Sequence, residues 1–279
     1  MIRRDFKELY LHLWNKKIYV SVLTNGTLIN EEYVQFFKTY PPDMIQISLY
    51  GSCEEAYVNV TGHKGFQKAF RAISMLKDAG IDVRVAVTPS KYLMNDYIPI
   101  LNLCRSNKFI VVNGDIALLC NRDNPEKIDY FLTLDEIVDL SIKRAELYGQ
   151  RVKCNEAPEP GGNLFASPAK GLFCNGGNSL ATVTYDGRMY PCINAMVGGV
   201  SLLDNNYKEA WEQTVLAASQ IISGRECVGC VYDNTCAKCP SMRLKDFNSG
   251  SCNPEMCKLT RALVANGVKK ILKDEPDCE

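Results

Sequence analysis

The sequence lacks an excess of charge of either sign, a long hydrophobic run and a usable set of histidines. Its 32 Lys and Arg residues balance 32 Asp and Glu residues, so electrostatics give no reason to expect a nucleic-acid or anionic-membrane partner. No stretch approaches the roughly 18 consecutive apolar residues of a membrane-spanning helix. Two histidines in 279 residues are too few for a histidine metal site. These absences exclude strongly basic and membrane-spanning classes of protein.

The first residues also lack the features of a secretory signal peptide. They mix charged and aromatic side chains, without an apolar core or a small-residue cleavage site. Hydrophobic residues make up 46% of the chain, which is enough to bury a substantial core. We therefore expect a folded protein of the cytoplasm with one large or two modest domains.

Cysteine, in contrast, is abundant and unevenly distributed. Nine of the 13 cysteines follow residue 173, whereas a secreted disulfide scaffold would be short and dense in cysteine throughout. In a reducing compartment such a cluster more often binds metal. The cysteines of the first part lie in or beside apolar segments and are expected to be mostly buried small hydrophobes. They are Cys53, Cys104, Cys120 and Cys154.

Strand-like and helix-like segments alternate in the first half. The β-rich runs are residues 18–23, 44–49, 83–88, and 109–112 with 116–119. Helical spacing and capping signals predict helices over 31–37, 66–79, 96–104 and 133–148. Repeated units of this kind predict a parallel sheet with right-handed crossovers. Ligands of such sheets bind where strands end, here at 24–26, 48–51 and 88–89.

The second half has a different character. Proline and glycine over residues 156–162 predict a linker, so we expect domains over 1–155 and 156–279. Asp186-Gly187, between two short β runs, predicts a hairpin with a type I′ turn. Cys174 and Cys192 flank this hairpin, which can therefore bring them together. A helix is expected around residues 207–222.

Six cysteines near the C-terminus have the spacing of metal ligands. They are Cys227, Cys230, Cys236, Cys239, Cys252 and Cys257. The first four form two Cys-x2-Cys pairs, whose turns direct two thiolates at one metal. Zinc would make such sites structural, whereas iron–sulfur clusters would make them redox-active. The spacing favours metal over disulfides and leaves zinc and iron as open alternatives.

The full pattern of cysteines resembles the SPASM domain, the C-terminal extension of many radical S-adenosylmethionine (radical SAM) enzymes. The resemblance rests on Gly187-x4-Cys192 followed by the two pairs, although the last pair is one residue shorter than in the family. It implies two auxiliary 4Fe–4S clusters with interleaved ligands. One set would be Cys174, Cys192 and Cys239, and the other Cys227, Cys230, Cys236 and Cys257, with Cys252 as an alternate for Cys257.

The first half resembles the partial barrel of the same enzymes. Thr24-Asn25-Gly26 is similar to the family's strand end, and Ile47–Gly51 to its Ser-Leu-x-Gly segment, which lies near S-adenosylmethionine. The resemblance implies that Thr24, Asn25, Gly26 and Ser48 bind this cofactor. The expected fold class is α/β: a truncated, partial TIM-like radical SAM barrel followed by a small α+β cysteine-rich domain.

The family's Cys-x3-Cys-x2-Cys loop and its Gly-Gly-Glu-Pro segment are absent from the sequence. The resemblance would place both upstream of Met1, so we expect a chain that lacks the family's N-terminal part. That loop binds the cluster that cleaves S-adenosylmethionine. We therefore expect the chain as it stands to bind S-adenosylmethionine weakly or not at all, and to be unable to start radical chemistry.

The residue at position 193 helps to distinguish between the reactions that enzymes of this family catalyse. Sulfatase-maturing members of the family carry an Asp base directly after the Gly-x4-Cys cysteine, where this chain has Ile193. The Ser-Leu-Tyr-Gly segment instead resembles maturases that modify a ribosomally made peptide or protein. The alternative from another class is a non-catalytic, zinc-binding interaction module on an α/β scaffold, because the catalytic cysteine triad is missing.

Overall fold

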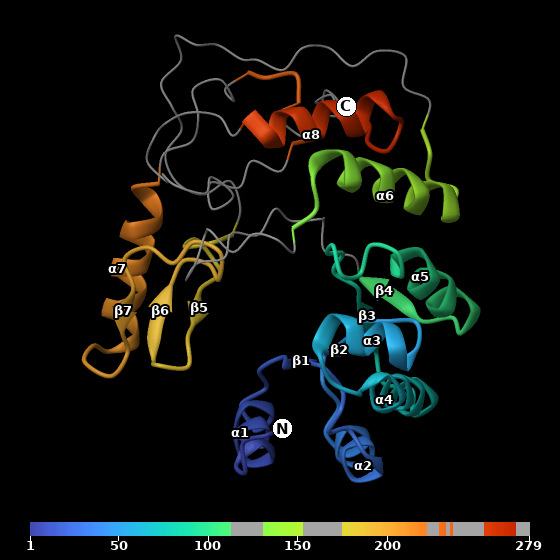
Figure 1. Cartoon of the computed structure of the whole chain (residues 1–279). Coiled ribbons are helices and arrows are strands. Elements are labelled where there is room, and N and C mark those ends of the chain that lie inside the picture. Colours follow the sequence, from blue (N-terminus) through green and yellow to red (C-terminus); the bar gives the residue numbers. More distant parts are fainter. Residues whose placement is uncertain (113–130, 153–174, 222–228, 233–234, 237–253, 272–279) are drawn as a thin grey trace, which may run out of the picture. The chain divides into compact units, whose positions relative to one another are not determined.

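The computed structural model describes residues 1–112, 131–152, 175–221, 229–232, 235–236 and 254–271 (Figure 1). The chain divides into two compact units. The first contains residues 1–112 with 131–132, and the second contains the described residues from Thr133 onward. The expected linker at 156–162 lies outside the described residues, and the expected boundary at residue 155 stays a prediction.

The first unit is built on a four-stranded parallel sheet. Its strands are β1 (Ser21–Thr24), β2 (Met44–Ser48), β3 (Val83–Ala86) and β4 (Ile110–Val112), paired in that order. The connections contain α2 (Glu31–Thr39), α3 (Glu54–Thr61), α4 (Phe66–Asp78) and α5 (Tyr97–Ser106) (Figure 1). The predicted parallel α/β fold is confirmed. The predicted strand segment at 116–119 lies outside the described residues.

One face of this sheet forms the core of the unit. Val22, Ile45 and Val83 are buried, and helix α4 contacts both β2 and β3. Side chains alternate along a strand, so the intervening residues point to the other face. There Leu23 is 66% and Ile110 60% exposed. An open second face of this kind is consistent with a partial barrel, in which the helices cover only the outside.

An aromatic cluster attaches α1 (Phe6–Asn15) to α2. The Tyr10 ring lies edge-on to Phe36 and Phe37, at centroid distances of 5.3 and 5.7 Å. Its hydroxyl donates to the carbonyl oxygen of Tyr40 at 2.9 Å. Burial raises the pKa of Tyr10 to about 12, so this phenol remains protonated and the hydrogen bond persists across the ordinary pH range.

Helix ends follow the capping signals of the sequence. The Asn30 side chain accepts from the Tyr33 N–H at 3.0 Å, as expected for the start of α2. Thr133 and Glu136 form the predicted reciprocal capping box at the start of α6 (Leu134–Leu147). Gly80 follows α4 with a φ of 74°, a left-handed conformation that glycine adopts without cost.

The second unit contains a three-stranded antiparallel sheet. Its strands β5 (Thr182–Val183), β6 (Arg188–Tyr190) and β7 (Val200–Ser201) pair in sequence order. Helix α7 (Tyr207–Ser219) contacts β6 and β7, and Met189, Val200 and Ala210 form the buried cluster between them. The predicted hairpin and the predicted helix are therefore confirmed.

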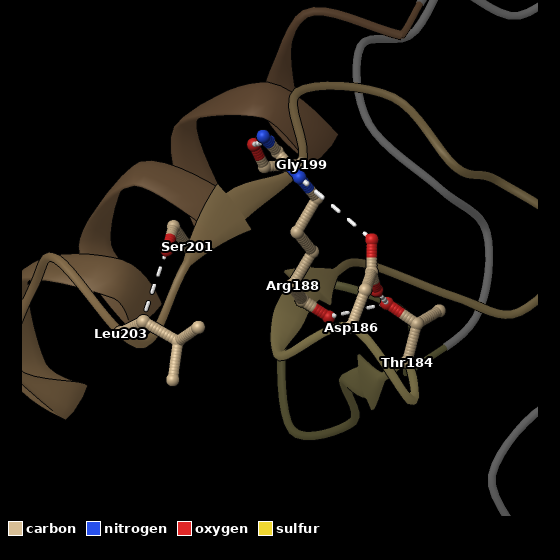
Figure 2. A network of polar contacts seen from close by, with 6 residues as sticks. All are labelled: Thr184, Asp186, Arg188, Gly199, Ser201 and Leu203. Atoms are coloured by element: carbon tan, nitrogen blue, oxygen red, sulfur yellow. Dashed lines mark hydrogen bonds and ion pairs between the residues drawn. The ribbon is translucent and has the colours of Figure 1, made fainter.

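The prediction of a type I′ turn at Asp186-Gly187 is wrong. Such a turn needs positive φ at both central residues, but only Gly187 has it, at 78°. The Gly187 N–H donates to the Thr184 carbonyl at 2.9 Å, and the Thr184 N–H donates to the Arg188 carbonyl at 2.9 Å. The loop is thus three residues long, with glycine in the left-handed position. Asp186 also accepts from the Thr184 hydroxyl and pairs with Arg188, as Figure 2 shows.

Helices α6 and α8 (Pro254–Ala265) contact each other in the same unit. Beyond α8, the Val152 N–H donates to the Gly267 carbonyl at 2.8 Å. A Cβ on Gly267 would lie 2.3 Å from the Val152 carbonyl oxygen, so only glycine permits this approach. The segment after α6 and the segment after α8 are therefore joined. Among the described helices, none combines the length and apolar character needed to cross a membrane.

Candidate cofactor and cluster sites

The predicted cofactor residues lie at one edge of the first sheet. Thr24 is paired with Ile47 and Ser48 with Ala86 in the parallel register, so β1, β2 and β3 end side by side. The chain turns away after Thr24 through Asn25 and Gly26. The structure therefore brings together the strand ends from which the cofactor site was predicted, while the binding roles of these residues stay a prediction.

A tight turn shapes the segment after β1. The Gly26 N–H donates to Thr24 Oγ1 at 3.2 Å, and Asn25 Oδ1 accepts from the N–H and the hydroxyl of Thr27 at 3.1 and 2.9 Å. Gly26 has a φ of 74°, and a Cβ there would lie 2.9 Å from Ile47 Cγ2. The turn thus packs directly on the buried face of β2 and needs glycine for both conformation and space.

The segment after β2 is held by two carboxylates. Asp96 accepts two hydrogen bonds from Ser52, one from its backbone N–H at 2.5 Å and one from its hydroxyl at 2.6 Å. Glu54 accepts from the N–H groups of Gly65, Phe66 and Gln67 at 2.5, 3.3 and 3.3 Å. These three N–H groups belong to the first turn of α4 and its cap, where a carboxylate is favoured.

The pKa of Glu54 reflects this position. Desolvation by burial raises it, but the three N–H donors and the nearby Lys64 outweigh that effect, so the pKa lies below the ordinary value. The loop between α3 and α4 is also closely packed, because a Cβ on Gly65 would lie 2.6 Å from the Tyr57 ring. The carboxylate therefore stays ionised over the neutral range and caps α4.

Sequence reasoning missed these two carboxylates. Residue 96 was expected only to start a helix, and the acidic pair Glu54-Glu55 in the first turn of the unpredicted α3 gave a signal that was not used. Ser52 and Asp96 are 44 residues apart in sequence, and no spacing rule relates residues of different β–α units. The Thr61-Gly62 segment carried a usable signal, because it ends α3 with Gly62 in the left-handed conformation.

The proposed cluster ligands are only partly within the described residues. Cys192, Cys230, Cys236 and Cys257 are described and are partly buried, whereas Cys174, Cys227, Cys239 and Cys252 lie outside. Cys192 Sγ accepts from the Asn194 N–H at 3.4 Å. Cys257 lies within the first turns of α8.

In the described ranges, no three Cys, His, Asp or Glu side chains gather in a way that could hold a metal ion. The two interleaved ligand sets therefore stay predictions. The backbone N–H contact to Cys192 Sγ fits a metal-bound sulfur, because hydrogen bonds to the sulfurs are common in such sites. Ile193, the next residue, has an exposed side chain (56%) that cannot accept a proton.

Of the four cysteines of the first part, Cys53 and Cys104 are described, whereas Cys120 and Cys154 lie outside the described residues. Cys104 is fully buried, and burial raises its thiol pKa to about 12, as expected for a small hydrophobe. Cys53 is exposed, so it is an exception to the expectation that these cysteines are mostly buried. The reason is that Cys53 stands at the N-cap of α3 rather than inside an apolar element.

Comparison with known proteins agrees with this architecture. Residues 1–104 match the family model of the radical SAM superfamily. The AdoMet-dependent heme synthase of Nitratidesulfovibrio vulgaris is 23% identical over 263 residues, which cover 86% of this chain and 71% of that protein. The subtilosin biosynthesis protein AlbA of Bacillus subtilis is 42% identical over 71 residues, 25% of this chain and 16% of AlbA.

Solved structures of two proteins share the fold. Native anSMEcpe with bound AdoMet has a TM-score of 0.64 at 19% identity, and the match covers 94% of this chain and 78% of that one. SuiB of Streptococcus suis, bound to precursor peptide SuiA, has a TM-score of 0.62 at 14% identity over 91% of this chain and 62% of SuiB. The chain therefore has the radical SAM fold, and its residues 1–104 match the model of that superfamily. Its resemblance to these enzymes is confirmed.

Proposed function

We propose that this chain is an iron–sulfur-cluster-binding protein of the radical SAM/SPASM type, similar to maturases that modify a ribosomally made peptide or protein. The observation that carries the proposal is the parallel sheet whose neighbouring strand ends bring Thr24–Gly26 and Ser48 to one edge, within a radical SAM domain. Ligands of such sheets bind at this edge. The cysteine pattern of the second half adds the SPASM assignment.

The cofactor of this edge would be S-adenosylmethionine, which supplies a radical when it is reductively cleaved at an iron–sulfur cluster. Asn25 would contribute its side-chain amide, since its oxygen is occupied by Thr27 whereas its Nδ2 donates to no described residue. Ser48 would contribute a hydroxyl. The 279 residues contain no Cys-x3-Cys-x2-Cys sequence, so we propose that they do not cleave the cofactor by themselves.

Two auxiliary 4Fe–4S clusters would occupy the second half. Cys174, Cys192 and Cys239 would hold one, and Cys227, Cys230, Cys236 and Cys257 the other. Thiolates of this kind need reducing surroundings, so the proposal includes the cytoplasm as the place of action. The N–H group of Asn194 would stabilise the Cys192 thiolate.

A peptide or protein substrate is supported by two of the similar proteins. SuiB was solved with a precursor peptide, and AlbA is named for bacteriocin biosynthesis. Sulfatase maturation is disfavoured, because Ile193 stands where a carboxylate base would be needed. A heme precursor is the second candidate substrate, since a relative that matches 86% of the chain is a heme synthase.

The cluster proposal has a direct test. Protein purified without oxygen should be brown, and dithionite should bleach the colour, because thiolate-bound 4Fe–4S clusters absorb visible light and accept electrons. A colourless protein would favour the zinc-binding interaction module instead. Mixing the brown protein with candidate precursor peptides or heme precursors, and measuring binding to each, then separates the two substrate classes.

A further inference from the structure

A carboxylate from one β–α unit holds the loop of its neighbour. Asp96 immediately precedes α5, which follows β3, whereas Ser52 lies in the loop after β2. Both carboxylate oxygens are used: Oδ2 accepts from the Ser52 N–H at 2.5 Å and Oδ1 from its hydroxyl at 2.6 Å. The contact therefore joins the two chain segments that leave adjacent strands at the ligand edge of the sheet.

This arrangement leaves α5 without a side-chain cap. Asp96 occupies the N-cap position of α5, where a carboxylate ordinarily accepts from an N–H of the helix's own first turn. No such bond is formed, since Asp96 has helical backbone angles (φ −105°, ψ −3°) instead of the extended ones of a capping residue, and its carboxylate is directed to Ser52. Hydrogen bonds to an ionised carboxylate are among the stronger ones. The side chain therefore orders the loop rather than the helix that it precedes.

The same loop is packed closely against α3. A Cβ on Gly51 would lie 2.4 Å from the Tyr57 backbone nitrogen, and the Tyr50 ring lies edge-on to Tyr57 at 5.7 Å. On the strand side, the Leu49 N–H donates to the Ala86 carbonyl at 3.0 Å. Sterics, ring packing and the sheet thus restrict residues 49–51, and Asp96 adds the polar tie at Ser52.

We propose that Asp96 is a positioning residue, which keeps the segment from Ser48 to Ser52 in one conformation so that a ligand at this edge meets a preformed surface. Ordering a loop during binding costs affinity, and a tie already made in the free protein removes that cost. The identity of the ligand, S-adenosylmethionine, rests on the proposed function, whereas the positioning effect does not.

Amide hydrogen exchange measured by NMR tests the positioning effect directly. Asp96→Ala should accelerate exchange at Leu49, Tyr50 and Gly51 about tenfold, while the buried amides of α4 are unchanged. Asp96→Asn should lie between this variant and the wild type, because its amide oxygen still accepts one hydrogen bond. Ser52 itself is left out of the comparison, since its N–H loses a partner in any case.

Asp82→Asn is the matched control. It also removes a carboxylate from the first unit, but this one pairs with Arg84 at 2.9 Å, at the opposite end of β3. Its exchange at residues 49–51 should equal that of the wild type. Unchanged exchange at these residues in Asp96→Ala, or equal acceleration throughout the unit, would overturn the proposal.

A titration with S-adenosylmethionine separates the positioning role from the proposed function. Chemical shifts of residues 24–26 and 48–51 report binding even at millimolar affinity. If the wild type binds, Asp96→Ala should bind at least threefold more weakly, and equal affinity would overturn the positioning role. If the wild type does not bind, S-adenosylmethionine is not a ligand of this chain, and the exchange rates alone decide for or against the positioning role.

Discussion

At the scale of single residues, surroundings determine what each thiol can do. Cys53 and Cys104 have the same chemistry, but Cys53 is exposed at the start of α3 whereas Cys104 is fully buried in α5. Burial disfavours the charged thiolate and raises the pKa of Cys104 to about 12. Since the thiolate is the nucleophile, Cys53 is the one of these two thiols that is expected to react.

Alkylation of the folded protein should show this difference. Iodoacetamide at pH 8 should modify Cys53 completely and leave Cys104 unmodified, while both should react in urea. Mass spectrometry of the two tryptic peptides measures the outcome. Equal rates for the two cysteines in the folded protein would mean that α5 is not packed as described.

The turn after β1 requires glycine at position 26, because no other residue fits both its conformation and its space. Gly26→Ala should destabilise the protein by about 2–5 kcal/mol, because the left-handed conformation costs about 1–2 kcal/mol and overpacking against the buried Ile47 adds about 1–3 kcal/mol. Gly80→Ala is the control, since Gly80 has the same φ of 74° and nothing within 4 Å of its Cβ position. Denaturant unfolding of both variants should therefore show a larger loss for Gly26→Ala. Equal losses would argue against the close contact with Ile47.

At the scale of elements, the N-terminus of α4 depends on a side chain from α3. The three N–H bonds hold the pKa of Glu54 below its ordinary value, despite desolvation. A carboxylate with a lowered folded-state pKa adds stability above its unfolded pKa of about 4.3, and that stability is lost as the pH falls through the folded-state pKa.

Glu54→Gln should therefore unfold at a lower temperature than the wild type at pH 7, and the difference should shrink as the pH falls below about 4. Glu55→Gln, at the exposed neighbouring position, should match the wild type at both pH values. Thermal unfolding followed by circular dichroism measures the four comparisons. A difference in unfolding temperature between Glu54→Gln and the wild type that stays constant with pH would show that the charge of Glu54 does not contribute to stability.

The elements also show which parts of the fold the sequence predicts. Periodicity and caps located α2, α4, α5 and α6, because Asn30, Thr133 and Gly80 are local signals. Helix α3 was missed, since its Val58, Val60 and Thr61 are β-branched residues that favour strands; only the burial of Tyr57 (4% exposed) gives it a packed face. The hairpin was found, but its turn type was wrong, because an Asp-Gly pair fits both loop lengths.

The sequence predicted the strand ends of the candidate site but not the contact that joins its loops. Thr24–Gly26 and Ser48 were found from strand ends, because parallel strands end at one edge. The tie between Asp96 and Ser52 was not, because it joins two units through tertiary structure alone.

At the scale of the whole molecule, the proposed clusters connect distant segments of the second half. Interleaved ligand sets make metal binding part of the folding energy. Cys239→Ala should then remove roughly half of the iron and leave the Cys227, Cys230 and Cys236 site partly filled. Cys230→Ala is the comparison variant, and iron analysis with electron paramagnetic resonance distinguishes the two clusters. If both variants lose the same cluster and the cluster bound by Cys174 and Cys192 stays intact, the two sites are sequential rather than interleaved.

The stoichiometry of iron, sulfide and zinc in protein purified without oxygen tests the central claim most directly. Two 4Fe–4S clusters predict about eight iron and eight sulfide per chain, with little zinc. A protein that contains about two zinc ions and no sulfide would contradict the claim, and it would make the second half a structural zinc domain on a radical SAM scaffold.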